Sequence, residues 1–78
     1  DNKDPIEEQI LKQSDVMRIH LLLHNLAEPY KEVFMLRVFG ELSFKQIAYI
    51  FRKTDNWACV TYHRARNKIL MQTEANNE

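Results

Sequence analysis

Residues 42–69 decide the fold of this chain, and they read LSFKQIAYIFRKTDNWACVTYHRARNKI. A short amphipathic helix is predicted first, because apolar residues recur there at helical spacing: Phe44, Ile47, Ala48 and Phe51. Ser43 is suited to cap that helix, and Thr54 to cap a second one after the polar turn at residues 52–54. Two short helices, a tight turn and a basic second helix are typical of a helix-turn-helix motif.

The composition points to one small all-α domain. The chain has 78 residues, 45% of them hydrophobic, and one glycine with two prolines leaves little room for hairpins. A single cysteine excludes an internal disulfide and a multi-cysteine metal site, so no metal or cofactor is expected. No apolar run reaches membrane-spanning length and no signal-peptide pattern opens the chain, so we expect a cytoplasmic protein.

The charges are distributed unevenly along the chain. Residues 1–42 hold five basic and eight acidic side chains, whereas residues 43–72 hold six basic and one acidic, a balance of +5. A positive region of this kind is expected where a protein contacts nucleic acid, although a solvated basic helix face would look the same.

Upstream of the motif, Asp4 and Pro5 are typical of a helix opening, and Glu7 completes a capping box. We expect one long helix from Pro5 to about Asn25, although Ser14 and Asp15 could cap a second helix and divide it. The domain is expected to span residues 4–72, between a frayed start at 1–3 and a disordered tail at 73–78.

The segment between the long helix and the motif is the most apolar part of the chain. A turn at residues 26–29 should place Pro29 at the start of a helix over residues 30–39, which is expected to be central and buried. Gly40 is expected to end this helix. Arg37 is the only charged residue in the apolar run over residues 33–39. It could lie at the edge of the core with its charged end in water, or it could contact a DNA phosphate.

The last helix is expected to have two different faces. Steps of about 100° per residue bring four residues to an inward face: Ala58, Tyr62, Ala65 and Ile69. The opposite face carries Asn56, Val60, His63 and Asn67, with Cys59 and Arg64 at its edges. This mixture can recognise bases, because asparagine pairs with adenine, arginine with guanine, and apolar groups contact the thymine methyl.

Four segments resemble, in order, the C-terminal domain (region 4) of bacterial sigma factors of the extracytoplasmic-function type. They are DPIEE at residues 4–8, LAEPYKEVFMLR at 26–37, LSFKQIAYIF at 42–51 and HRARNKI at 63–69. The family patterns that they resemble are DPEE, LPEEYREVLLLR, LSYEEIAEIL and HRARKRL. The resemblance implies sequence-specific binding of duplex DNA at the promoter −35 element, while the domain is attached to RNA polymerase core through its β-subunit flap. Anti-sigma factors are further partners that it implies.

The resemblance also implies a set of DNA contacts by position. Base and phosphate contacts fall on Asn56, Trp57, Cys59, Val60, Thr61, His63 and Arg64, with Arg37, Phe44 and Lys45 near the backbone. Lys53 in the turn and Asn67 on the outward face complete the expected DNA-binding set.

The chain departs from the family pattern at the DNA-contacting helix. The usual GTVKSRL is here NWACVTY at residues 56–62, so Cys59 and Thr61 replace basic residues and Val60 replaces serine. Losing two cations should weaken the attraction to phosphates and its salt dependence. Gly40 and Glu41 also invert the usual Glu-Gly order. The companion domain that reads the −10 element is missing, so we expect a piece of a longer protein.

Two other functions remain open at this stage. One is a different helix-turn-helix regulator, and the other is a protein-interaction domain, favoured by the missing cations and by Leu70 and Met71, which should be exposed. We expect no enzymatic activity and no small-molecule substrate, because the chain has no Gly-rich phosphate loop, no paired carboxylates on a buried face and no convincing nucleophile. His20 and His24 have metal-ligand spacing, but no further ligand completes a site.

Overall fold

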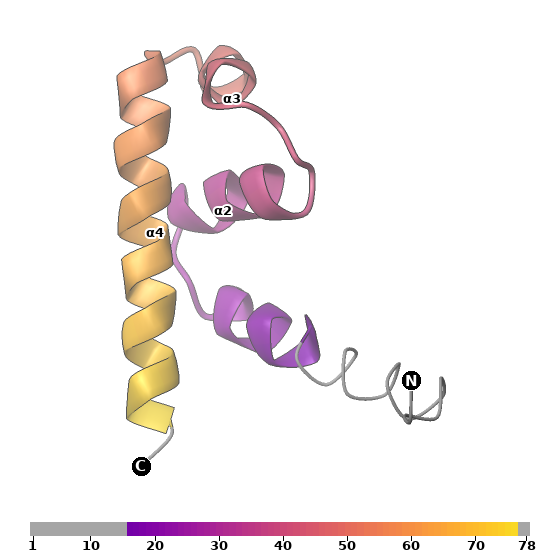
Figure 1. Ribbon diagram of the computed structural model, residues 1–78, viewed down its shortest axis with the longest axis vertical. Coiled ribbons are helices and arrows are strands. Elements are labelled where there is room, and N and C mark those ends of the chain that lie inside the picture. Colours follow the sequence, from indigo (N-terminus) through magenta and orange to yellow (C-terminus); the bar gives the residue numbers. More distant parts are fainter. Residues whose placement is uncertain (1–15, 77–78) are drawn as a thin grey trace, which may run out of the picture.

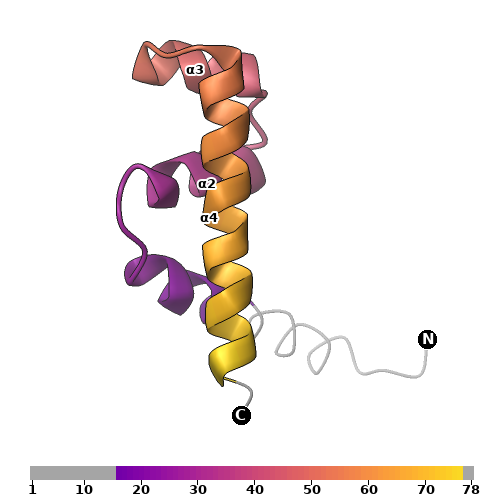
Figure 2. The same ribbon diagram turned by 90° about the vertical axis from the view of Figure 1, so that its left-hand side faces the viewer.

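The computed structural model describes residues 16–76, which form an all-α domain with four helices. Residues 16–24 are helical, and α2 (Tyr30–Val38), α3 (Phe44–Phe51) and α4 (Asp55–Asn76) follow. α4 runs the height of the molecule, and the three shorter helices lie on one side of it (Figure 1). Figure 2, turned by 90°, shows α4 in front of the other helices. The predicted fold class is therefore confirmed, and the other helices of residues 16–76 leave one side of α4 uncovered.

The predicted starts of the two helices of the motif are confirmed by their caps. The Ser43 hydroxyl accepts a hydrogen bond from the Gln46 backbone N–H at 3.1 Å, and the Gln46 side-chain oxygen accepts one from the Ser43 N–H at 2.9 Å. Thr54 Oγ1 accepts from the Trp57 N–H at 3.0 Å. These bonds satisfy backbone donors that have no partner within a helix, so they fix where α3 and α4 begin.

Two hydrophobic clusters hold the shorter helices against α4. The first joins the 16–24 helix and α2 to the C-terminal half of α4 through six buried residues: Leu22, Leu23, Leu26, Phe34, Ala65 and Ile69. The second joins α2 and α3 to the N-terminal half of α4 through Val33, Ile47, Ala48 and Ala58. Tyr62 packs against both clusters. The motif is therefore held in place by a scaffold that extends along α4.

The structure corrects the prediction that residues 30–39 form a buried central helix. Only Val33 and Phe34 of α2 are buried, whereas Met35, Val38 and the following Phe39 are 37–42% exposed. Because the three shorter helices all lie on one side of α4, no further helix of the described residues covers the far side of α2. The pattern of apolar residues alone did not distinguish burial on all sides from an uncovered apolar surface.

The turn between α2 and α3 is tight, and it depends on Gly40. The Gly40 N–H donates to the Met35 carbonyl at 3.0 Å, and a Cβ at Gly40 would lie 2.7 Å from the Leu36 oxygen. The left-handed residue here is Glu41, with a φ of 57°. Because Gly40 and Glu41 stand in the inverted order, it is the glutamate, and not the glycine, that adopts the left-handed conformation that glycine adopts most easily.

The helix bounds agree with the prediction at most ends. The 16–24 helix ends one residue before the expected Asn25. α4 continues to Asn76, whereas we expected order to end near Gln72. The predicted opening at Asp4, the alternative cap at Ser14 and Asp15, the frayed start at 1–3 and residues 77–78 of the tail lie outside the described residues.

Candidate nucleic-acid interface

The uncovered side of α4 carries most of the side chains that the sequence predicted there. Val60 is 37% exposed, and Asn56, His63, Arg64 and Asn67 are also exposed. The residues at the opposite angle are buried: Ala58, Thr61, Ala65 and Ile69. The 100° periodicity therefore placed the outward face and three of the four predicted inward residues correctly. The fourth, Tyr62, is half-buried and packs against both clusters, whereas Thr61, which was not predicted to face inward, is buried.

Thr61 differs from its predicted role as a DNA contact. Its side chain is only 5% exposed, in line with Ala58 and Ala65 on the packed side of α4. A side chain buried there cannot reach a phosphate or a base edge. The replacement of a basic residue by threonine at this position is thus compatible with the packing of this chain.

Arg37 is also placed differently from a free phosphate contact. Its Nη1 atom donates a hydrogen bond to the Leu42 carbonyl oxygen at 2.9 Å, and its Cζ atom lies 4.3 Å from the centre of the Phe44 ring. The guanidinium group is half-buried and joins α2 to the segment that enters α3. The structure favours the first of the two predicted roles, a residue at the edge of the core.

Trp57 and Cys59 are half-buried at the edges of the exposed face. The Trp57 ring packs against Phe51, with 5.2 Å between ring centres, and Lys53 Nζ lies 5.9 Å from the Trp57 ring. Trp57 therefore braces the turn between α3 and α4. Its contacts keep Lys53 beside the N-terminal end of α4.

Aromatic contacts also position His63 and the neighbouring core. The His63 ring lies 5.3 Å from Tyr62 and 6.4 Å from Phe44, measured between ring centres. Tyr62 is further stacked on Phe34 at 5.9 Å. This aromatic group was not predicted, because its members are far apart in the sequence.

Three exposed cations lie outside α4 but within the motif, and two of them, Lys45 and Lys53, were predicted to contact DNA; the third is Arg52. Lys45 belongs to the first turn of α3, and Lys53 to the turn before α4. With Arg64 they are exposed cations available for phosphates. Lys68 is used differently, since its Nζ atom lies 5.0 Å from the Tyr30 ring and fastens α4 to α2.

Sequence analysis missed an exposed apolar pair on α3, Tyr49 and Ile50. Both lie on the side of α3 opposite the buried Ile47 and Ala48. Their helical angle was a usable signal, because the four predicted core positions already filled one face of this helix.

Two features considered from the sequence, a metal site and a membrane-spanning helix, can be compared with the described residues. Within residues 16–76, no group of three or more His, Cys, Asp or Glu side chains could hold a metal ion. In the same part of the chain, no helix has the length and apolar character needed to cross a membrane. The candidate site is the exposed face of α4, because the exposed polar and basic side chains predicted there lie on it.

Comparison with known proteins gives one match. A family model described as "Sigma-70, region 4" matches residues 16–69, which is well over half of the chain. No curated protein and no solved structure matches the chain. The match covers the 16–24 helix, α2, α3 and most of α4, including every residue predicted to contact DNA.

Proposed function

The chain belongs to the sigma-70 region 4 family, and from this premise we propose that it recognises the −35 element of promoter DNA. In this proposal it is the C-terminal domain of an alternative sigma factor of the extracytoplasmic-function type. It acts in transcription initiation together with RNA polymerase core. Its proposed location is the bacterial cytoplasm, which contains the promoter DNA.

The observation that carries the proposal is the uncovered face of α4. Asn56, Val60, His63 and Asn67 lie on a helix face that no other helix of the described residues covers. The major groove admits one α-helix, and the second helix of a helix-turn-helix enters it with its N-terminal residues toward the bases. Asn56 and Val60 stand in the first two turns of α4, which suits them to contact bases.

The proposed contacts divide into two kinds. The Asn56 amide suits adenine, and the Val60 methyl groups suit the thymine methyl, so these residues should determine sequence preference. Arg64, Lys45 and Lys53 supply positive charge and should bind phosphates. His63, Asn67, Trp57 and Cys59 complete the proposed surface, whereas Thr61 and Arg37 are left out because of their burial and contacts.

The test is selection of bound duplexes from a randomised pool, followed by affinity measurements across a range of salt concentrations. We expect an enriched motif and an affinity that falls as salt rises. Asn56→Ala should change the enriched motif, whereas Arg64→Ala should weaken binding to all duplexes. Arg18→Ala removes another exposed positive charge, from the 16–24 helix, which lies far from the start of α4, and serves as the matched control.

Two results would contradict the proposed DNA site. Equal affinities of the Arg64→Ala variant and the unchanged chain at moderate salt would remove Arg64 from the phosphate contacts. An absence of binding at low salt, with a normal helical circular dichroism spectrum, would reject DNA binding by the isolated chain. It would favour the second candidate, a domain that mainly binds proteins.

The exposed apolar end of α2 favours this second candidate. Met35, Val38 and Phe39 share one helix face by their spacing and are each about 40% exposed, although the His20 ring stacks on Phe39 at 5.0 Å. An apolar surface of this kind often marks a protein contact. We propose that it binds RNA polymerase core through the β-subunit flap, and that an anti-sigma factor competes for it.

Binding of purified polymerase core to the chain tests the α2 surface separately from DNA. Val38→Ser should weaken core binding and leave duplex binding unchanged, because Val38 lies outside the motif. Met71→Ser, at an exposed position near the end of α4, is the matched control. If Val38→Ser binds core as tightly as the control, the polymerase contact lies elsewhere.

A further inference from the structure

Tyr49 and Ile50 form an apolar ridge on the outer side of α3. Tyr49 is 85% exposed and Ile50 is 50% exposed, and both belong to the amphipathic helix α3. The core of α3 is supplied by other residues, Ile47 and Ala48, which are fully buried. The exposed pair is therefore not needed to fill the interior of this domain.

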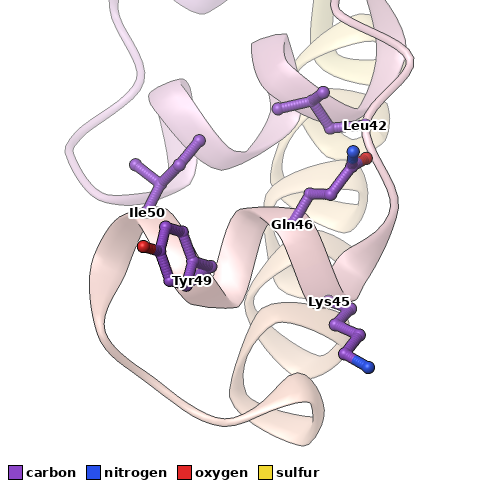
Figure 3. Close-up of a pocket in the computed structure, with 5 residues that line it drawn as sticks. All are labelled: Leu42, Lys45, Gln46, Tyr49 and Ile50. Atoms are coloured by element: carbon purple, nitrogen blue, oxygen red, sulfur yellow. The ribbon is translucent and has the colours of Figure 1, made fainter.

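A shallow hollow lies on each side of this ridge. The first has a volume of about 440 Å³ and is lined by Leu42, Lys45, Gln46, Tyr49 and Ile50 (Figure 3). The second has a volume of about 470 Å³ and is lined by Ala48, Tyr49, Ile50, Arg52 and Lys53. Figure 3 shows Leu42 and Gln46 on one side and Tyr49 and Ile50 on the other, with the Lys45 ammonium group pointing away from them.

The floor of the first hollow is held in a fixed geometry. The Gln46 side chain is engaged in the capping box with Ser43, and this pair fixes the entry of the chain into α3. The Arg37 hydrogen bond to the Leu42 carbonyl oxygen fixes the preceding residue. A partner would therefore meet a preformed surface, which lowers the entropic cost of binding.

The charges around the ridge all have the same sign. Residues 42–54 contain Lys45, Arg52 and Lys53 and no aspartate or glutamate; Glu41 and Asp55 lie just outside this segment. Within the described part of the chain, neither Lys45 nor Arg52 forms an ion pair or a cation–π contact. The first hollow is lined mainly by apolar side chains and the second is bordered by Arg52 and Lys53, so the surface calls for an amphipathic partner that carries negative charge.

We propose that this surface, the α3 ridge with its two hollows, docks an acidic amphipathic helix of a partner protein. Apolar side chains of the partner, spaced one turn apart, would enter the hollows on either side of Tyr49 and Ile50. Carboxylates along the flank of the same helix would reach Arg52 and the neighbouring lysines. Burial of apolar area supplies affinity, and the charges select an acidic partner.

Duplex DNA fits this ridge less well than a protein helix does. DNA would neutralise the cations but offers phosphate and sugar, which cannot cover an isoleucine and a tyrosine ring as a protein helix can. Lys45 and Lys53 are shared with the proposed DNA surface, whereas Tyr49, Ile50 and Arg52 are not. The test of docking therefore rests on the latter three residues.

The experiment titrates the 78-residue chain with three synthetic peptides that are held helical. The first carries leucines at positions i, i+3 and i+7 with flanking glutamates; the second replaces the glutamates by lysines, and the third replaces the leucines by serines. Fluorescence anisotropy gives the affinities, and ¹⁵N NMR shifts locate the site. We expect binding of the first peptide alone, with the largest shifts at Tyr49, Ile50 and Arg52.

Variants separate the contributions of the ridge and its charge. Ile50→Ser should weaken binding of the acidic peptide by roughly tenfold, because the free energy gained by burying an isoleucine side chain corresponds to about that change in affinity. Arg52→Ala should weaken it about threefold and reduce its salt dependence. Met71→Ser removes an apolar side chain that is 68% exposed at the other end of α4, and it should change nothing.

Several outcomes would overturn the docking proposal. The proposal would be overturned if the lysine peptide bound as tightly as the glutamate peptide, or if no peptide bound. It would also be overturned if the NMR shifts mapped to α2 or to the exposed face of α4. Concentration-dependent self-association that Ile50→Ser abolishes would identify a second copy of the chain as the occupant instead. Shifts of Tyr49 and Ile50 on addition of duplex DNA, as large as those with the acidic peptide, would assign the ridge to DNA.

Discussion

Arg37 and Phe44 join α2 to α3 through a cation–π contact, with the guanidinium carbon 4.3 Å from the ring centre. The same guanidinium donates a hydrogen bond to the Leu42 carbonyl oxygen at 2.9 Å, so one side chain of α2 holds the α3 end of the segment between the two helices. Since Phe44 packs on Tyr62 of α4, this contact orients α3 relative to the proposed DNA-binding helix. Its role is to support the site rather than to touch DNA.

Arg37→Ala should therefore destabilise the domain. The loss of a half-buried cation–π contact and of a charged hydrogen bond is expected to lower the free energy of unfolding by about 1–2 kcal/mol. Urea unfolding followed by circular dichroism measures this change. Arg37→Lys keeps the charge but loses the planar donor, so its free energy of unfolding should lie between those of the unchanged chain and of Arg37→Ala. Unchanged stability together with a reduced salt dependence of DNA binding would instead make Arg37 a phosphate contact.

Glu41→Gly should stabilise the domain. Glu41 has a φ of 57°, where a residue with a Cβ pays a conformational cost that glycine avoids. Part of the gain is lost, because glycine is more flexible in the unfolded chain, so we expect a net gain of about 0.5–1 kcal/mol. Thermal unfolding measures it. Glu41→Ala is the control, because it removes the carboxylate but leaves a Cβ at the same backbone conformation. A gain in stability as large as that of Glu41→Gly would refute the conformational explanation.

Gly40→Ala should have the opposite effect. The added Cβ would meet the Leu36 carbonyl oxygen at 2.7 Å, and this neighbour is backbone that cannot turn aside as a side chain can. We expect a loss of about 1 kcal/mol or more, since the tight turn after α2 must shift. Chemical denaturation of Gly40→Ala and of the double variant with Glu41→Gly measures it. If Gly40→Ala unfolds at the same urea concentration as the unchanged chain, the turn is not constrained in this way.

The local features of the fold could be predicted because they depend on residues close together in the sequence. The Ser43 and Thr54 caps and the two faces of α4 follow from spacing within one helix, and the structure confirms them. The exposure of α2 could not be predicted, because it depends on which sides of a helix other helices cover. An apolar run is compatible with both a buried and a half-covered helix.

The candidate site shows the same division. The exposure of Asn56 and Val60 followed from the periodicity of α4, whereas the burial of Thr61 depends on how closely α2 and α3 approach that helix. The contacts of Arg37 with Leu42 and Phe44 likewise need the geometry of the turn. Which exposed residues contact DNA is a prediction that the selection experiment must test.

The burial of Thr61 and the partial exposure of Cys59 lead to a last prediction, on two positions that are usually basic in the resembling family. Cys59 lies at the edge of the exposed face of α4, so Cys59→Arg can extend its charge into solvent and toward a phosphate. It should raise duplex affinity and steepen the salt dependence by about one phosphate contact, with little change in stability.

Thr61→Arg should behave differently, because position 61 is only 5% exposed on the packed side of the helix. Burial of a guanidinium without a partner should lower the free energy of unfolding by roughly 2 kcal/mol, with no gain in DNA affinity. Thr61→Val, nearly equal in volume, controls for the loss of the hydroxyl. Duplex affinities across a range of salt concentrations and urea unfolding should be measured for Cys59→Arg, Thr61→Arg and Thr61→Val. If Thr61→Arg strengthens DNA binding as much as Cys59→Arg does, position 61 faces the DNA and the packed face of α4 is rotated from the one described.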